Sequence, residues 1–121
     1  MHFQTPIDMK IFIGIISSLL IWIASFQGIQ KTTFKVFGNC TECKERIEQA
    51  LDVKGVQIAN WNIDSKQLFI KYDPEKISLE QIHSLIAAVG HDTDKMKAPD
   101  SVYVKLPECC LFRNGDNTHH D

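Results

Sequence analysis

The 121-residue sequence lacks an excess of positive charge: thirteen Lys and Arg stand against fifteen Asp and Glu, a formal net charge of −2. Nucleic-acid-binding domains usually gather basic side chains on one face, so this balance argues against a nucleic-acid partner. Cysteine is also scarce, with four residues in two close pairs. Four are too few for a disulfide-dense scaffold, which favours thiol chemistry at a particular site as their role.

The sequence also lacks a recognisable catalytic motif. It has no glycine-rich phosphate loop, no serine and histidine paired by motif, and no setting for paired carboxylates. We therefore expect a binding protein rather than an enzyme. A thiol oxidoreductase is the alternative enzyme interpretation, because two of the cysteines are separated by only two residues.

One long apolar run is present, at residues 11–26, which contain no charged side chain and directly follow Lys10. The run has the length of the core of a secretion signal and is short for a spanning helix of ~20 residues. We expect residues 1–28 to form a signal peptide or an N-terminal membrane anchor, with a buried core helix as a third alternative. The first two place the rest of the chain outside the cytoplasmic membrane, either periplasmic or anchored facing the periplasm.

From residue 31 onward, strand-like and helix-like patterns alternate. Alternating apolar positions predict strands at 32–37, 56–63 and 67–72, and a short fourth strand is expected at 91–96. Apolar stripes at helical spacing predict one helix from about residue 41 and another after Ser78, which forms a capping box with Gln81. The predicted core positions are Phe34, Val36, Cys43, Ile47, Leu51, Ala59, Trp61, Ile63, Leu68, Ile70, Tyr72, Ile82, Ile86 and Val89. His83 falls beside the second stripe, and we expect it to be exposed.

This order, β-α-β-β-α-β, is that of a ferredoxin-like α+β sandwich, in which two helices cover one face of a four-stranded antiparallel sheet. The predicted domain covers residues 31–98, a length that can fold alone. Residues 99–121 then form a C-terminal tail. Within the tail, residues 102–104 can extend a strand before Pro107 ends it.

Cys40 and Cys43 lie at the expected junction between the first strand and the first helix. Thiolates are soft ligands, which select copper(I), mercury(II), zinc or cadmium over magnesium and calcium. The free N–H groups and dipole of the first helical turn should favour the Cys43 thiolate. A redox pair and an inert disulfide are the alternatives, and an oxidising compartment would favour the disulfide.

Several short motifs occur in the order found in one known family. They are Cys40-Thr41-Glu42-Cys43, Ile47 with Leu51, Gly55-Val56, Trp61-Asn62, Tyr72-Asp73-Pro74 and Ala88-Val89-Gly90. On these motifs, the chain resembles the heavy-metal-associated domain of copper chaperones, metal-pumping ATPases and periplasmic mercury-binding proteins. One feature departs from the family pattern: two steps rather than three separate Gly38 from Cys40, and the usual loop methionine is absent.

The resemblance implies a carrier of a soft metal ion, with copper(I) favoured and mercury(II), zinc or cadmium as alternatives. Cys40 and Cys43 would be its primary ligands, and the ion would pass to a metal transporter or another metal-binding domain by ligand exchange. In the resembled fold, the loop that holds His91 lies beside the metal loop. His91 is therefore a candidate third ligand or hydrogen-bond partner, or else a solvated loop histidine. A metal-free interaction module is the remaining alternative.

Cys109 and Cys110 lie in the tail, which the resemblance does not explain. Adjacent cysteines bond to each other only in a strained ring, so a disulfide between them is disfavoured. They can complete a four-thiolate site with Cys40 and Cys43, form a second site, cross-link to the first pair, or remain idle. We treat both as candidate metal ligands because thiols are soft.

Overall fold

The computed structural model describes residues 27–114. The predicted leader at 1–28 therefore lies almost entirely outside the described residues. Within them, no helix has the length and apolar character needed to cross a membrane. The elements are β1 (Gln30–Lys35), α2 (Thr41–Ala50), β2 (Val56–Trp61), β3 (Gln67–Tyr72), α3 (Leu79–Ala88), α4 (Asp100–Tyr103), and the 3-10 turns η1 (Glu108–Cys110) and η2 (Phe112–Asn114).

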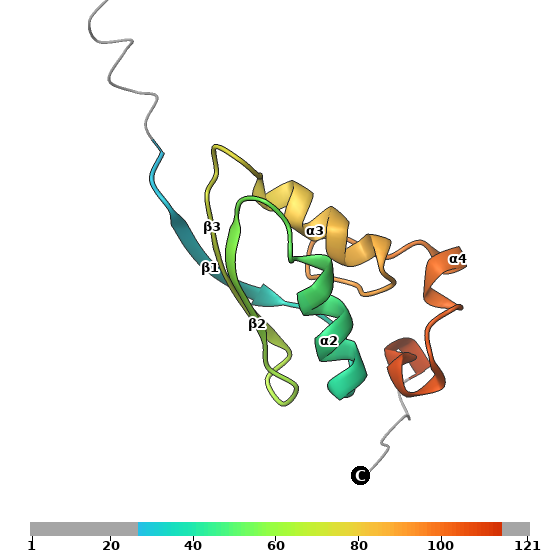
Figure 1. Ribbon diagram of the computed structural model, residues 1–121. Helices are drawn as coiled ribbons and strands as arrows, with labels where there is room; N and C mark the ends of the chain where they lie inside the picture. The colour runs from blue at the N-terminus through green and yellow to red at the C-terminus, as the bar shows by residue number, and fades with distance from the viewer. Residues whose placement is uncertain (1–26, 115–121) are drawn as a thin grey trace, which may run out of the picture.

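The strands form an antiparallel sheet in the order β1-β3-β2. Helices α2 and α3 lie side by side on one face of it, which gives the α+β architecture that the sequence predicts (Figure 1). The turn between β2 and β3 is held by the Asn62 side chain, which accepts hydrogen bonds from the backbone N–H groups of Asp64 and Ser65. This turn sets the register that places Trp61 opposite Leu68.

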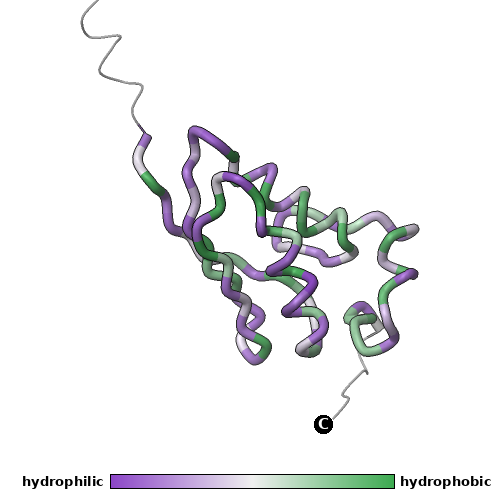
Figure 2. The backbone as a smooth tube through the Cα atoms, viewed as in Figure 1, coloured by the Kyte–Doolittle hydropathy of each residue, from purple (hydrophilic) through white to green (hydrophobic). Residues whose placement is uncertain are grey.

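The core lies between the sheet and the two helices. Hydrophobic and hydrophilic stretches alternate along the chain, as periodic burial requires (Figure 2). Eleven of the predicted core positions are buried: Phe34, Val36, Cys43, Ile47, Leu51, Trp61, Leu68, Ile70, Tyr72, Ile82 and Ile86. Ala59, Ile63 and Val89 are only half-buried.

Helix α3 begins and ends as its sequence predicts. The Ser78 side chain accepts the backbone N–H of Gln81, and the Gln81 side chain accepts the backbone N–H of Ser78, so the capping box is present. After the helix, Gly90 has a φ of +102°, and a Cβ there would lie 2.9 Å from a methyl carbon of Leu106. The chain turns at a position that only glycine suits, and the tail packs directly against it.

The predicted fourth strand is wrong. The described residues form a three-stranded sheet, and residues 91–96 contribute only an isolated bridge between Val36 and Thr93. The Thr93 hydroxyl accepts the backbone N–H groups of Lys95 and Met96, and the Thr93 N–H donates to Met96 O. These contacts close a turn where a strand would have to continue. The described fold is therefore β-α-β-β-α.

His83 is buried rather than exposed, with 2% of its surface accessible. Its ring stacks on Phe34 at a centroid distance of 4.1 Å, and its Nδ1 lies 2.6 Å from the Thr93 hydroxyl oxygen. The apolar stripe of α3 is wider than Ile82 and Ile86 alone, because His83 and Ala87 are buried beside them. The loop after the helix covers this extra flank.

The sequence predicted an extended segment at residues 102–104, and this prediction is wrong. Residues 100–103 form helix α4 instead, and Tyr103 and Leu106 are buried in the same core as the sheet and helices. The turn at Gly90 and the short helix bring the chain back toward the start of α2. The tail therefore ends beside the loop that holds the first cysteine pair.

Candidate metal centre

The loop between β1 and α2 is fixed by close contact with Trp61. The Trp61 indole N–H donates to Val36 O at 3.0 Å. A Cβ at Gly38 would lie 3.0 Å from the indole ring and 3.1 Å from the Cys43 Cβ. Glycine therefore lets the loop pass tightly over the ring, and this passage places Cys40 at the N-terminal cap of α2 and Cys43 in its first turn.

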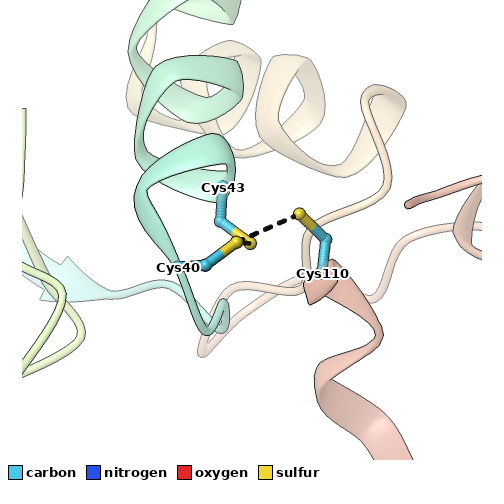
Figure 3. Close-up of side chains that lie close together, drawn as sticks. All are labelled: Cys40, Cys43 and Cys110. Carbon is cyan, nitrogen blue, oxygen red and sulfur yellow. Dashed lines mark hydrogen bonds between the residues drawn. The ribbon is translucent and has the colours of Figure 1, made fainter. Parts of the chain in front are cut away.

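Three thiols converge at this loop. The Sγ of Cys40 lies 3.3 Å from that of Cys43 and 3.5 Å from that of Cys110, which arrives from η1 in the tail (Figure 3). The three sulfur atoms all lie within 4.8 Å of one another, and all four cysteines are free thiols. Sulfur atoms arranged in this way can all contact one small soft ion.

The three thiols differ in exposure and in pKa. Cys43 and Cys110 are fully buried, and burial raises the pKa of both thiols. Cys40 is half-buried, and burial alone would raise its pKa too. Hydrogen bonds from the Cys43 backbone and from the thiols of Cys43, Cys109 and Cys110 outweigh this effect and lower the Cys40 pKa. Burial is the largest influence on the Cys43 thiol and raises its pKa, while backbone hydrogen bonds at the helix start lower the pKa as predicted without outweighing the burial.

Two donors aim at the sulfur atoms. The backbone N–H of Asn39 donates to the Cys43 Sγ at 3.4 Å, and Nη1 of Arg46 donates to the Cys110 Sγ at 3.2 Å. The guanidinium places one positive charge beside sulfur atoms that become negative when they bind a metal. Arg46 was not singled out from the sequence, although it follows Cys43 by three residues on α2 and so projects from the same side of the helix.

Cys109 occupies a different position. Its thiol donates to the Glu42 carboxylate at 3.2 Å, and its Sγ lies 3.7 Å from that of Cys110. Glu42, Cys109 and Cys110 form a second group of three possible ligands within 4.8 Å. Burial and the Glu42 carboxylate raise the pKa of Cys109 to about 11. Of the two tail cysteines, the structure brings Cys110 to the first pair and leaves Cys109 at the rim.

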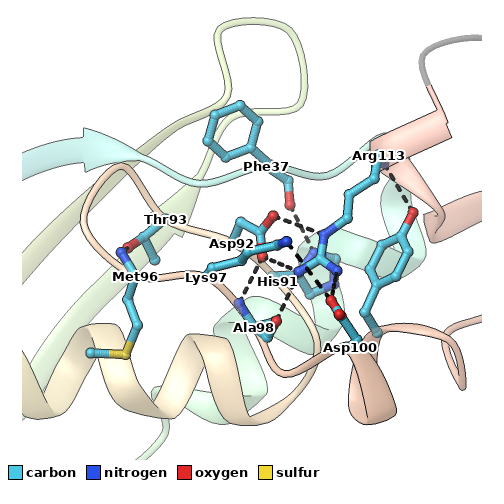
Figure 4. Close-up of polar contacts among 10 residues, drawn as sticks. Phe37, His91, Asp92, Thr93, Met96, Lys97, Ala98, Asp100 and Arg113 are labelled. Atoms are coloured by element: carbon cyan, nitrogen blue, oxygen red, sulfur yellow. Dashed lines mark hydrogen bonds and ion pairs between the residues drawn. The ribbon is translucent and has the colours of Figure 1, made fainter.

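Arg113 holds the tail in this place. Its Nη2 donates to the Asp92 carboxylate at 2.7 Å and to Ala98 O at 2.8 Å, its Nε donates to the other Asp92 oxygen, and its Nη1 donates to Asp100 (Figure 4). Burial alone would raise the pKa of Asp92, but hydrogen bonds from Arg113 and from the Ala98 N–H, together with nearby positive charge, lower it below its usual value. The guanidinium also covers the Tyr103 ring at 4.1 Å. Sequence reasoning missed this clamp, which joins residues with no shared motif.

His91 lies near the centre, outside both groups of possible ligands. It is fully buried, its Nδ1 lies 2.8 Å from Phe37 O, and its ring stacks on Phe112 from the tail. A carbonyl oxygen can only accept, so Nδ1 carries the proton in this bond. Burial lowers the His91 pKa, and its Nε2 has no hydrogen-bond partner among the described residues. His91 here supports the loop and the tail, and it is not the solvated histidine of the alternative interpretation.

Comparisons with known proteins identify the family of the part of the chain that carries Cys40 and Cys43. The family model of the heavy-metal-associated domain matches residues 33–92. Copper chaperone CopZ of Staphylococcus aureus is 33% identical over 55 residues, which are 45% of this chain and 81% of CopZ. A zinc-transporting ATPase of Synechocystis is 36% identical over 61 residues, half of this chain but only 8% of the ATPase.

Solved structures give the same result. A CopZ metallochaperone superposes with a TM-score of 0.51 at 30% identity, covering 53% of this chain and 98% of the chaperone. Oxidized MerP from Ralstonia metallidurans has the same fold, with a TM-score of 0.52 at 23% identity over 55% of this chain and 96% of MerP. The metallochaperones among these matches agree with the expectation of a binding protein rather than an enzyme. The chain belongs to the heavy-metal-associated domain family.

Proposed function

We propose that this protein binds one soft metal ion, with copper(I) favoured, through Cys40, Cys43 and Cys110, and delivers or sequesters it outside the cytoplasmic membrane. The convergence of three thiols from two distant segments carries the proposal. Soft sulfur donors select copper(I), mercury(II), zinc or cadmium over hard cations. The name of the CopZ relative favours copper(I) among these ions.

Transfer would proceed by exchange of thiolate ligands. Cys40 and Cys109 are both half-buried, so a partner's thiolate can approach the bound ion at the rim of the centre. The partner in this proposal is a metal transporter or another metal-binding domain, which the similarity to a segment of a zinc-transporting ATPase supports. The location outside the cytoplasmic membrane rests on the uncharged apolar run at residues 11–26.

The test is a competition for copper(I) between a chromophoric chelator and the reduced, full-length protein. Cys40→Ser/Cys43→Ser should abolish binding, because a hydroxyl is a hard and weakly acidic ligand. Cys110→Ser should weaken binding by more than the roughly 10–100-fold that the loss of an outer-shell partner typically costs. Glu45→Gln, an exposed change on the same helix, is the control and should bind as the wild type does.

Two results would contradict the proposal. Copper(I) affinity retained by the Cys40→Ser/Cys43→Ser protein would remove the first pair from the site. Wild-type affinity in Cys110→Ser would reduce the site to the two loop thiols. Circular dichroism of each variant shows whether the fold is kept, so that lost binding is not mistaken for unfolding.

A further inference from the structure

Cys110 belongs to two groups of possible ligands at once. On one side its Sγ lies 3.5 Å from that of Cys40, inside the buried group with Cys43. On the other side it lies 3.7 Å from the Sγ of Cys109, in the outer group with Glu42. A sulfur chain therefore runs from Cys109 through Cys110 and Cys40 to Cys43, and each step is shorter than 4 Å.

The two ends of this chain differ in access to solvent. Cys43, at one end, is fully buried, and Cys109, at the other end, is partly exposed; of the two sulfurs between them, Cys110 is fully buried and Cys40 is half-buried. Neighbouring residues of a 3-10 turn project in different directions, so one of two adjacent cysteines points inward and the other outward. The hydrogen bond from Cys109 to Glu42 nevertheless keeps the outer sulfur beside the inner one.

We propose that Cys109 and Cys110 form an outer pair through which the soft metal ion reaches and leaves the buried thiols. This inference rests on the proposed function of soft-metal binding and adds a second, transient site to it. An ion delivered by a donor thiolate binds first to Cys109 and Cys110. The bond to the donor sulfur breaks as bonds to the two cysteine sulfurs form, and the protons of the two thiols pass to the released donor thiolate and to water. It then moves inward while it remains attached to Cys110.

The inward step is a ligand exchange without any change of oxidation state. The bond between the ion and the Cys109 sulfur breaks as bonds to the Cys40 and Cys43 sulfurs form. Protons displaced from these thiols pass to the released Cys109 thiolate and to water, and release of the ion follows the same steps in reverse. Sharing Cys110 means that the ion is never without a thiolate ligand, which keeps the intermediate states low in energy.

The outer pair predicts a kinetic effect without an equilibrium effect. Cys109 does not hold the ion in its resting position, so Cys109→Ser should leave the copper(I) dissociation constant within about twofold of the wild type. The same change should slow both uptake and release by about one decade or more, and by the same factor, because both follow one path. Glu108→Gln, an exposed change in the same turn, should alter neither rate.

The experiment mixes reduced full-length protein with the copper(I) complex of bathocuproine disulfonate in a stopped-flow instrument and follows chelator absorbance in both directions. Matched slowing of uptake and release in Cys109→Ser supports the outer pair. Unchanged rates would overturn it and place the path at Cys40. Lost affinity through faster release would also overturn it, because Cys109 would then be a ligand of the resting site. If the wild type binds no copper(I), the proposed function itself fails, which is a separate result.

Discussion

At the metal centre, one side chain places a positive charge beside the buried sulfur atoms. It is that of Arg46, since its guanidinium donates to the sulfur of Cys110. Without a positive neighbour, a third buried thiolate would add uncompensated negative charge to the filled site. Lys44 does not serve this purpose, because its ammonium group bonds Asn60, Trp61 O and Glu48 instead. The positive charge of Arg46 can thus balance the negative charge that Cys110 gains as a thiolate.

His83 makes the stability of the domain depend on pH. Burial lowers its pKa; nearby Asp94 acts in the opposite direction, and Lys95 reinforces the lowering. In the unfolded chain the pKa is about 6.5, so the unfolded state binds more protons in mildly acidic solution. Stability that is fully present above the unfolded pKa is therefore lost as the pH falls from about 6.5 toward the folded value.

His83→Gln removes this titration while keeping a side chain that can hydrogen-bond Thr93. We expect the urea midpoint of the metal-free wild type to fall between pH 7.5 and pH 5.5, and to fall less in the variant. Buried His91 also has a lowered pKa, so part of the decrease should remain. Equal decreases in the two proteins would show that His83 does not contribute to the acid sensitivity.

At the scale of elements, Arg113 determines where η1 lies. Its hydrogen bonds to Asp92, Asp100 and Ala98 O fasten the end of the tail to the loop after α3. The Asp92 and Arg113 side chains are both less than one-fifth exposed, so this ion pair is poorly screened by solvent. Hydrogen bonds to charged groups contribute roughly 1.5–3 kcal/mol each.

Arg113→Ala should therefore release the tail without unfolding the domain. We expect amide hydrogens at 108–113 to exchange at least about tenfold faster, a change equivalent to about 1.4 kcal/mol, while those of α2 and β3 keep their rates. Lys97→Ala is the control, because its ion pair with Asp100 is exposed and spans 3.8 Å. Faster exchange throughout the domain would mean that Arg113 supports the whole fold rather than the tail.

The sequence predicts elements well where the signal is local. The range of β3, the start of α2 and the capping box of α3 all follow from neighbouring residues, and all are confirmed. The misplaced features depend on distant partners. A fourth strand was expected at residues 91–96 after the second helix, but the Thr93 hydroxyl closes a turn there. The same hydroxyl contacts the buried His83 ring at 2.6 Å.

The residues of the candidate site also fall into those that a local motif predicts and those that depend on distant partners. Cys40 and Cys43 stand out because a short motif brings them together on one helix end. The sequence offered Cys109 and Cys110 as candidate ligands but could not tell them apart. Tertiary contacts distinguish them, because Cys110 lies beside Cys40 and Arg46 whereas Cys109 donates to Glu42. No periodic pattern relates Arg113 to Asp92, so the clamp was not predictable.

At the scale of the whole molecule, the metal ion should stabilise the domain, and Cys110 should be required for this effect. We expect an excess of copper(I) to raise the melting temperature of the reduced wild type, as any ligand that prefers the native state does. In Cys110→Ser the increase should be clearly smaller. Differential scanning calorimetry with and without copper(I) measures it, and equal increases in the two proteins would contradict the expectation.

The reason lies in the polymer physics of the chain. Cys40 and Cys43 are three residues apart, so an ion can bridge them almost as easily in the unfolded chain as in the native one. Cys40 and Cys110 are separated by 70 residues. Closing a loop of that length in an unfolded chain costs about 4 kcal/mol of entropy on the standard estimate for cross-links. The contact between η1 and the metal loop thus makes the bound ion a removable cross-link around almost the whole domain. A recipient that takes the ion therefore also removes the stability that this cross-link gives to the domain.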